Sequence, residues 1–193
     1  MEDVMKLFAH TLLLALLAGA APTAMAALKP GDAAPPFNAR AYLAGEPFDY
    51  SLQESLKAGP VVVYFFPAAH TAGCNVEARL FSEAIDDFKA EGATVIGVTA
   101  GNIDELADFS KETEHCGGKF PVAADPDAKI AKQYDALWVL RPGWSERTSY
   151  VIAPDGHIAD VYNALDPKHH VKEMLEGVRA LKTATPASSD QDK

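Results

Sequence analysis

Cysteine is scarce in this chain, and its scarcity limits the redox chemistry that the protein can perform. Only Cys74 and Cys116 occur among the 193 residues. A disulfide reductase of the Cys-x-x-Cys type needs two cysteines in that spacing, whereas Cys74 is followed by Asn75, Val76 and Glu77. At most one disulfide within the chain, between Cys74 and Cys116, is therefore available.

Basic side chains and long apolar runs are also few. The chain has 17 Lys and Arg against 27 Asp and Glu, a formal net charge of −10 at pH 7. An acidic balance disfavours nucleic-acid phosphates and anionic membrane surfaces as partners. The longest apolar run, residues 7–21, is shorter than the roughly 18 to 20 residues that a membrane-spanning helix needs. We therefore expect no nucleic-acid partner and no stable membrane insertion.

The apolar run at the N-terminus has the pattern of a secretory signal peptide. It follows Lys6 and precedes the small-residue site at residues 24–26. The acidic side chains before Lys6 are atypical of such a signal, so translation from Met5 stays an alternative to Met1. We predict that residues 1–26 are a cleaved signal peptide and that the protein is periplasmic or secreted.

The rest of the chain alternates strand and helix patterns, and we assign residues 27–182 to one domain. The apolar run at 61–66 is typical of a strand buried on both faces. The strand and helix patterns that follow it predict parallel pairing. The predicted strands are 37–42, 48–52, 61–66, 94–99, 120–123, 149–153 and 157–162, and the predicted helices are 73–91, 103–114, 125–134 and one from 167 onward.

This order predicts an α/β fold with a mixed central sheet flanked by helices and an N-terminal β-hairpin. Asn102 and Glu105 have the spacing of a capping box at the start of the helix from Ile103. Residues 183–193 lack apolar spacing, and we predict that they form a disordered tail.

Cys74 stands at the predicted start of the helix after the buried strand. A thiol is a nucleophile only as thiolate, and the unpaired amides and dipole of a helix start favour an anion. Thr71 offers a hydroxyl nearby, and Gly73 lets other groups approach the backbone. The alternative is that Cys74 is a small buried apolar residue and Thr71 an ordinary helix cap. These residues alone leave both interpretations open.

The segment containing Cys74 resembles a known motif. Residues 66–78, Phe-Pro-Ala-Ala-His-Thr-Ala-Gly-Cys-Asn-Val-Glu-Ala, closely resemble the peroxidatic-cysteine motif Pro-x-x-x-Thr-x-x-Cys of the peroxiredoxins. The Gly-Cys-x-x-Glu-Ala run is most similar to the Q-type branch, also called bacterioferritin comigratory proteins. The similarity extends from about Leu28 to Gly177.

The resemblance implies a thioredoxin-like fold and a thiol-dependent reduction of hydrogen peroxide and organic hydroperoxides. It implies an active site of Pro67, Thr71, Cys74 and an arginine entering a late strand, which Arg147 matches by context and for which Arg141 is a rival. Cys74 would become a sulfenic acid. No cofactor and no metal are implied.

The resemblance also bears on how the oxidised cysteine is resolved. Many Q-type members carry a second cysteine where this chain has Arg79, and some carry it on the following helix, where this chain has Cys116. We therefore expect a Cys74–Cys116 disulfide, reduced by a thioredoxin-like or other thiol donor, in a monomer. Disulfide geometry would require local unfolding of both segments. The alternative is a one-cysteine enzyme in which Cys116 has no part.

Other side chains and functions carry less weight. His70 is expected to be exposed on its loop, and His169-His170 lacks the partners of a metal site. Trp138 and Trp144 are expected to pack around a turn. Competing functions are a thioredoxin-like envelope disulfide reductase and a redox sensor in which Cys74 oxidation switches a partner without turnover.

Overall fold

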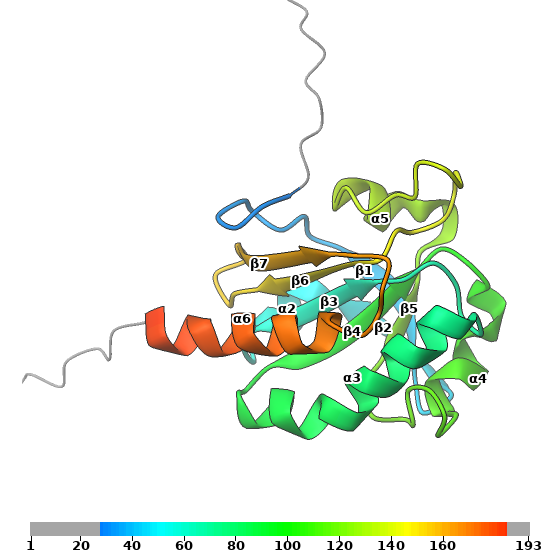
Figure 1. Cartoon of the computed structure of the whole chain (residues 1–193), viewed down its shortest axis with the longest axis horizontal. Coiled ribbons are helices and arrows are strands. Elements are labelled where there is room, and N and C mark those ends of the chain that lie inside the picture. Colours follow the sequence, from blue (N-terminus) through cyan, green and yellow to red (C-terminus); the bar gives the residue numbers. More distant parts are fainter. Residues whose placement is uncertain (1–27, 185–193) are drawn as a thin grey trace, which may run out of the picture.

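The computed structural model describes residues 28–184, which form one α/β domain (Figure 1). The predicted signal peptide lies outside the described residues, as does most of the predicted tail. The last helix includes Thr183 and Ala184, which the sequence assigned to that tail. None of the helices within residues 28–184 combines the length and the apolar character that spanning a membrane requires.

Seven strands form a single mixed sheet in the order β2-β1-β5-β4-β3-β6-β7. β3 pairs in parallel with β4, and β4 with β5. The remaining pairs are antiparallel, including the predicted hairpins β1–β2 and β6–β7. The mixed sheet is therefore confirmed. The strands are β1 (Asn38–Leu43), β2 (Glu46–Ser51), β3 (Val61–Phe65), β4 (Thr94–Thr99), β5 (Val122–Ala124), β6 (Thr148–Ile152) and β7 (Ile158–Asn163).

Helices cover both faces of this sheet (Figure 1). α3, α4 and α6 pack on one face, while α2, α5 and the β1–β2 hairpin enclose a core on the other. The helices are α2 (Leu52–Leu56), α3 (Ala72–Ala90), α4 (Leu106–Lys111), α5 (Lys129–Gln133) and α6 (His170–Ala184), with 3₁₀ turns η1 (Ile103–Glu105) and η2 (Pro126–Ala128). α2 was not predicted.

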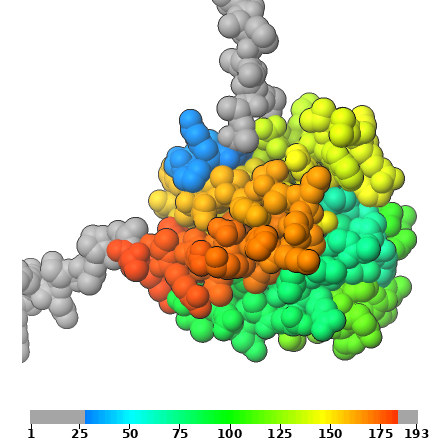
Figure 2. Space-filling model, in the orientation of Figure 1, coloured from blue at the N-terminus to red at the C-terminus, as the bar shows by residue number. Residues whose placement is uncertain are grey.

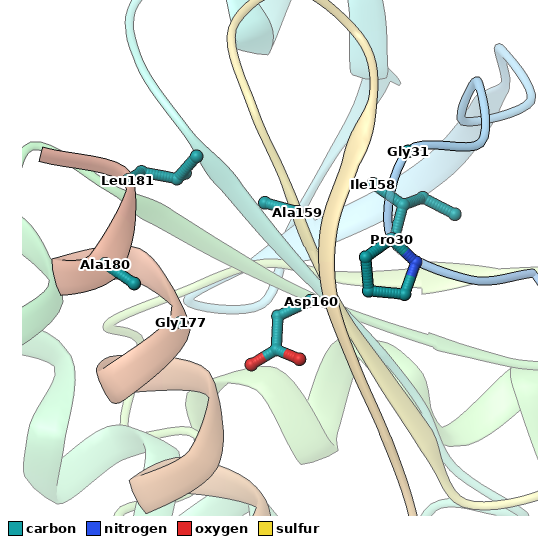
Figure 3. Close-up of a pocket in the computed structure, with 8 residues that line it drawn as sticks. All are labelled: Pro30, Gly31, Ile158, Ala159, Asp160, Gly177, Ala180 and Leu181. Atoms are coloured by element: carbon teal, nitrogen blue, oxygen red, sulfur yellow. The ribbon is translucent and has the colours of Figure 1, made fainter. Parts of the chain in front are cut away.

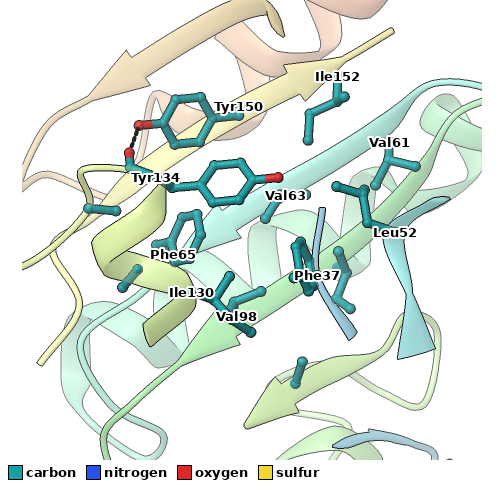
Figure 4. Close-up of a cluster of buried hydrophobic side chains, with 14 of the residues drawn as sticks. Phe37, Leu52, Val61, Val63, Phe65, Val98, Ile130, Tyr134, Tyr150 and Ile152 are labelled. Atoms are coloured by element: carbon teal, nitrogen blue, oxygen red, sulfur yellow. Dashed lines mark hydrogen bonds between the residues drawn. The ribbon is translucent and has the colours of Figure 1, made fainter. Parts of the chain in front are cut away.

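The central strand β3 divides the interior into two cores. Because side chains alternate along a strand, Val61, Val63 and Phe65 face one core and Val62 and Tyr64 face the other. Figure 4 shows the first core, in which the Tyr150 hydroxyl donates a hydrogen bond to the carbonyl of Tyr134. The second core lies beneath α3 and contains both cysteines.

The helix predicted at 103–114 is wrong in two respects. The α-helical part ends at Lys111, and Cys116 lies in the turn that follows. The capping box is also wrong, because Asn102 has left-handed backbone geometry (φ 53°) and makes no capping hydrogen bond with its side chain. Its amide instead donates to the carbonyl of Ala69, at 2.9 Å, and so ties η1 to the loop after β3.

The helix predicted at 125–134 is divided by two residues with positive φ, Asp127 and Ala128. The Asp125 carboxylate accepts hydrogen bonds from the backbone N–H groups of Ile130 and Ala131, at 2.9 and 2.8 Å. These bonds satisfy amides at the start of α5. The last helix begins at His170 rather than at 167.

α3 and α6 lie side by side, and their ends are joined. In the space-filling view the orange-red surface of α6 adjoins the green surface of α3 (Figure 2). At the C-terminal end of α3, Glu91 forms ion pairs with Arg179 at 3.1 Å and Lys182 at 2.6 Å. The opposite end of α3 holds Cys74.

Candidate active site

Cys74 lies in the first turn of α3 and is almost fully buried, with 1% of its surface exposed. Thr71 is the N-cap residue, with extended backbone geometry, and its carbonyl accepts the hydrogen bond of the Asn75 amide at 2.9 Å. The first amides of a helix have no intrahelical partner. The Cys74 sulfur therefore lies near a concentration of positive partial charge.

Arg147 supplies a full positive charge at the same place. It precedes β6, and its Nη2 lies 3.6 Å from the Cys74 sulfur. Its Nε donates to the carbonyl of Leu165 at 3.1 Å, and its Nη1 forms an ion pair with the Glu77 carboxylate. The guanidinium is thus held on three sides. The rival Arg141 lies instead over the ring of Trp144, 3.3 Å from its centroid.

Glu77 is fully buried one turn after Cys74 on α3. Burial raises the pKa of Glu77, and the guanidinium of Arg147 acts in the opposite direction. For Arg147, burial acts to lower the pKa, but Glu77 and Cys74 raise it above its ordinary value. Arg147 therefore stays charged beside the sulfur.

His170 completes this buried group. Its Nδ1 lies 3.6 Å from Glu77 Oε1, an oxygen that has no hydrogen-bond partner among the described residues. Burial lowers the pKa of His170 to about 4. The neutral ring can donate from Nε2 to the Ala164 carbonyl at 3.0 Å and accept at Nδ1 from the Ser149 hydroxyl at 2.7 Å. His170 therefore presents no positive charge to compete with Arg147 for Glu77.

Gly73 lets the guanidinium approach the helix start. A Cβ at this position would lie 2.9 Å from Arg147 Nη2, which is closer than side-chain atoms normally pack. Any larger residue would push Arg147 away from the backbone. Gly73 therefore allows the guanidinium to lie this close to the helix start.

Thr71 and Pro67 shape the loop between β3 and α3. The Thr71 hydroxyl donates to the carbonyl of Ala68 at 3.0 Å, which leaves its oxygen free to accept a further hydrogen bond. The carbonyl of Pro67 accepts a hydrogen bond from the Thr99 hydroxyl at 3.1 Å, and Gly101 packs closely against it. Thr71 thus lies at the helix start, and these hydrogen bonds join the loop to its own backbone and to β4.

Cys116 is also buried and free, with 0% of its surface exposed. It lies in the turn after α4, where the amides of Gly117 and Gly118 donate to the carbonyls of Glu112 and Ser110. Both glycines have positive φ. Burial, and to a lesser extent the charge of Glu112, raise the pKa of Cys116. The structure therefore brings Cys74 and Arg147 together but does not join Cys116 to them.

Glu77 and His170 are site residues to which the sequence alone assigns no role. A signal for Glu77 was present, because residues three apart on a helix share a face and Cys74 and Glu77 have that spacing. His170 had no comparable signal, since its contacts to Ser149 and Ala164 depend on the packing of α6 on β6.

The described surface also has hollows away from this site. One cavity of about 350 Å³ lies between β7 and α6, beside Pro30 and Gly31, with the Asp160 carboxylate at its side (Figure 3). Its lining includes neither Cys74 nor Arg147. The buried group around Cys74 is therefore the better candidate for chemistry.

Comparison with known proteins identifies the family. The family model described as "AhpC/TSA family" matches residues 30–161. Peroxiredoxin Q, chloroplastic, from Sedum lineare is 31% identical over 156 residues, covering 79% of this chain and 78% of that protein. Peroxiredoxin Q, chloroplastic, from Oryza sativa subsp. japonica is 32% identical over 129 residues, covering 65% of this chain but only 57% of the rice protein.

Solved structures agree with this assignment. The crystal structure of peroxidoxin BcpB from Mycobacterium tuberculosis superposes with a TM-score of 0.70 at 25% identity, covering 80% of this chain and 98% of that one. AhpC from Enterococcus faecalis superposes with a TM-score of 0.72 at 20% identity, covering 87% of this chain and all of that one, and supports the fold alone. The chain therefore belongs to the AhpC/TSA family and is a peroxiredoxin with a thioredoxin-like fold, a thiol-dependent peroxidase.

Proposed function

We propose that Cys74 is the thiol that reduces the hydroperoxide. The observation that carries this proposal is the 3.6 Å approach of Arg147 Nη2 to the Cys74 sulfur at the start of α3. A guanidinium beside a helix start favours the thiolate, which is the nucleophilic form. By contrast, burial and the nearby charge of Glu112 disfavour the thiolate of Cys116.

The proposed first step is attack of the Cys74 thiolate on one peroxide oxygen. An S–O bond forms as the O–O bond breaks, and the other oxygen leaves as water or an alcohol after taking a proton. Arg147 and the amides at the start of α3 stabilise the negative charge that develops on the leaving oxygen. The Thr71 oxygen is available to accept the hydrogen bond of a peroxide O–H. Cys74 is left as a sulfenic acid.

In the proposed second step, the Cys116 thiol attacks the sulfenic sulfur, releases water and forms a disulfide. Both cysteines start buried and free in the same core, so the start of α3 and the turn at Cys116 must open for them to meet in disulfide geometry. The two glycines after Cys116 lend that turn backbone freedom. An external dithiol then reduces the disulfide and is itself oxidised.

The resemblance to Q-type members supports two further parts of the proposal. The external dithiol is a thioredoxin-like protein, and the peroxidase acts as a monomer. The pattern of residues 1–26 supports export, in which case the mature chain begins at Ala27. Export is tested by the mass of the protein recovered from an envelope fraction, which should be that of a chain beginning at Ala27. The monomer is tested by light scattering of the purified protein, which should give the mass of one chain.

The experiment that tests the two cysteine roles uses one equivalent of hydrogen peroxide and intact mass spectrometry. The wild-type protein should lose two hydrogens as the disulfide forms. Cys116→Ser should gain one oxygen, trapped by a sulfenic acid reagent, and Cys74→Ser should not react at a comparable rate. Rapid oxidation of Cys74→Ser would refute the role of Cys74, and a sulfenic acid that persists in the wild-type protein would refute the role of Cys116.

A further inference from the structure

A cluster of four side chains joins the loop before Cys74 to the turn that contains Cys116. We call His70, Glu105, Glu112 and His115 the loop–turn cluster. His70 immediately precedes Thr71, and His115 immediately precedes Cys116. The cluster therefore links the two segments that must open if the cysteines are to meet.

The contacts within this cluster converge on one carboxylate oxygen. Glu112 Oε2 lies 2.9 Å from His70 Nε2 and 3.3 Å from His115 Nε2. One ligand atom from each of these three residues lies within 4.8 Å of the others. Two imidazole nitrogens and a carboxylate oxygen, with an open fourth position, are the ligand set of His₂Glu zinc sites. Ca²⁺ and Mg²⁺ prefer oxygen ligands alone.

The second nitrogen of His70 provides an independent indication of a metal ligand. His70 Nδ1 lies 2.6 Å from Glu105 Oε2. Histidines that bind metals usually donate their other ring N–H to a carboxylate or carbonyl, which fixes the ring and its tautomer. Glu105 stands in that position. His70 also has positive φ (58°), which is uncommon for a residue other than glycine, so the backbone as well as Glu105 sets the direction of its ring.

His115 is held in place by packing. Its side chain is only 13% exposed, and its ring lies 4.9 Å from that of Phe109, centroid to centroid. The His70 ring meets the same Phe109 edge-on at 5.3 Å. Both imidazoles are thus oriented before any ligand binds, which reduces the entropy lost on binding.

We propose that His70, Glu112 and His115 bind a divalent transition-metal cation, best matched by Zn²⁺, and that the bound cation slows formation of the Cys74–Cys116 disulfide. The second part rests on the proposed function, because it assumes that Cys116 resolves Cys74. A cation held by both histidines ties the loop at Thr71 to the turn at Cys116. Opening of that turn must then release the cation.

Binding involves exchange of a proton for the metal. Partial burial acts to lower the pKa of His70, but its hydrogen bonds to Glu105 and Glu112 outweigh it and raise the pKa above the ordinary value. Protonated His70 donates to both carboxylates. When the cation binds, His70 Nε2 coordinates it and any proton on Nε2 leaves to solvent, while the proton on Nδ1 stays on the ring and hydrogen-bonded to Glu105. No change in oxidation state is involved.

The site is tested first by itself, in a Cys74→Ser/Cys116→Ser double variant in which no thiol can bind metal. Zn²⁺ titration by calorimetry should give one cation per chain, and Co²⁺ should give the visible absorption of a four-coordinate site. His115→Ala and Glu112→Gln in this background should lose binding, and the exposed His169→Ala should retain it. Absence of binding, or binding that His115→Ala does not weaken, overturns the site.

The effect on the disulfide is tested in the full chain with both cysteines. A ligand that binds only the closed arrangement lowers the opened population by the factor 1 + [L]/Kd, so Zn²⁺ at about 100 times Kd should slow disulfide formation about 100-fold. His115→Ala should lose this effect. If Zn²⁺ slows disulfide formation equally in His115→Ala and in the wild-type protein, the metal acts on the thiols and the regulatory part of the proposal is overturned. A rate of disulfide formation that Zn²⁺ does not change in the wild-type protein overturns it as well. If no disulfide forms even without Zn²⁺, the proposed resolution fails, and the double-variant titration still decides the site.

Discussion

The two cysteines of this peroxiredoxin are equally hidden from solvent but have opposite electrostatic surroundings. Cys74 lies at a helix start beside the Arg147 guanidinium, whereas Cys116 lies in a turn where burial and the charge of Glu112 raise its pKa. Their exposed surfaces are 1% and 0%. If Cys74 is the reactive thiol, as proposed, the difference teaches that burial alone does not make a thiol inert, because a nearby cation can offset the cost of desolvating an anion.

Replacement of Arg147 should have the largest effect on the difference in reactivity between the two cysteines. Arg147→Ala should slow the oxidation of Cys74 by about 10² to 10³-fold, the usual cost of losing one preorganised donor at a developing anion. Stopped-flow fluorescence or competition kinetics with hydrogen peroxide measures this rate. Because the substitution leaves Glu77 buried without its partner, Arg147→Lys should be measured beside it. Arg141→Ala is the matched control. Slow oxidation of Cys74 in Arg141→Ala, together with a normal rate in Arg147→Ala, would assign the role to Arg141 instead of Arg147.

Acid should destabilise the Cys74 surroundings through His170. The folded-state pKa of His170, about 4, is below the ordinary 6.5, so the unfolded chain takes up the proton first as pH falls. Stability should therefore be lost between pH 6.5 and 4 and level off below, by about 3 kcal/mol in total. Urea unfolding across this range measures the loss.

His170→Gln isolates this contribution, because other groups also titrate in the same range. As the pH is lowered, the free energy of unfolding of His170→Gln should decrease less steeply than that of the wild type. The free energy of unfolding of the control His157→Gln, a substitution at an exposed residue, should decrease as steeply as that of the wild type. Identical slopes for wild type and His170→Gln would show that His170 is not held neutral.

Alkylation of single-cysteine variants should measure the difference in reactivity between the two thiols directly. With iodoacetamide at neutral pH, Cys74 in Cys116→Ser should react roughly tenfold faster than Cys116 in Cys74→Ser, because only the thiolate reacts and burial raises the pKa of Cys116. In urea the two rates should converge. Adding Glu112→Gln to the Cys74→Ser chain should accelerate Cys116 only slightly, since burial is the main cause of its raised pKa. Equal rates in the folded variants would contradict the contrast.

Gly73→Ala should produce the smallest change. The added methyl group would lie 2.9 Å from Arg147 Nη2, and a shift of the guanidinium by a few tenths of an ångström should slow Cys74 oxidation by about threefold to tenfold. Peroxide kinetics of Gly73→Ala beside Ala72→Ser, a substitution at an exposed neighbouring residue, measures this effect. A normal rate in Gly73→Ala would show that the contact does not position Arg147.

The sequence predicted most of the fold because its strands carry strong local patterns. The runs at 61–66 and 94–99 are apolar and bounded by turn residues, and both became central strands. Two of the failures lie where a side chain forms a hydrogen bond that local spacing does not reveal. Asn102 binds the loop carbonyl of Ala69 rather than capping η1, and Asp125 binds amides five and six residues ahead.

For the candidate site, the sequence could name the residues of one contiguous motif but not the network around it. Cys74 and Thr71 share one segment, and family context separated Arg147 from Arg141. His170 and the loop–turn cluster depend on segments that meet only in the folded chain. His70 and His115 are 45 positions apart in the sequence, so no local spacing could pair them as metal ligands, whereas the adjacent His169 and His170 have no ligand partners in the sequence pattern.

The placement of Glu77 has a consequence for how the enzyme fails under excess peroxide. In the proposed resolution, the first turns of α3 must unwind before Cys74 can reach Cys116. The Glu77 carboxylate, which is bound to Arg147 in the interior, holds those turns in place. While that turn stays wound, a second peroxide molecule can convert the sulfenic acid to sulfinic acid, which simple thiols do not reverse. On this proposal, the ion pair between Glu77 and Arg147 limits how soon the disulfide can form, and we expect peroxide supplied faster than α3 opens to inactivate the protein.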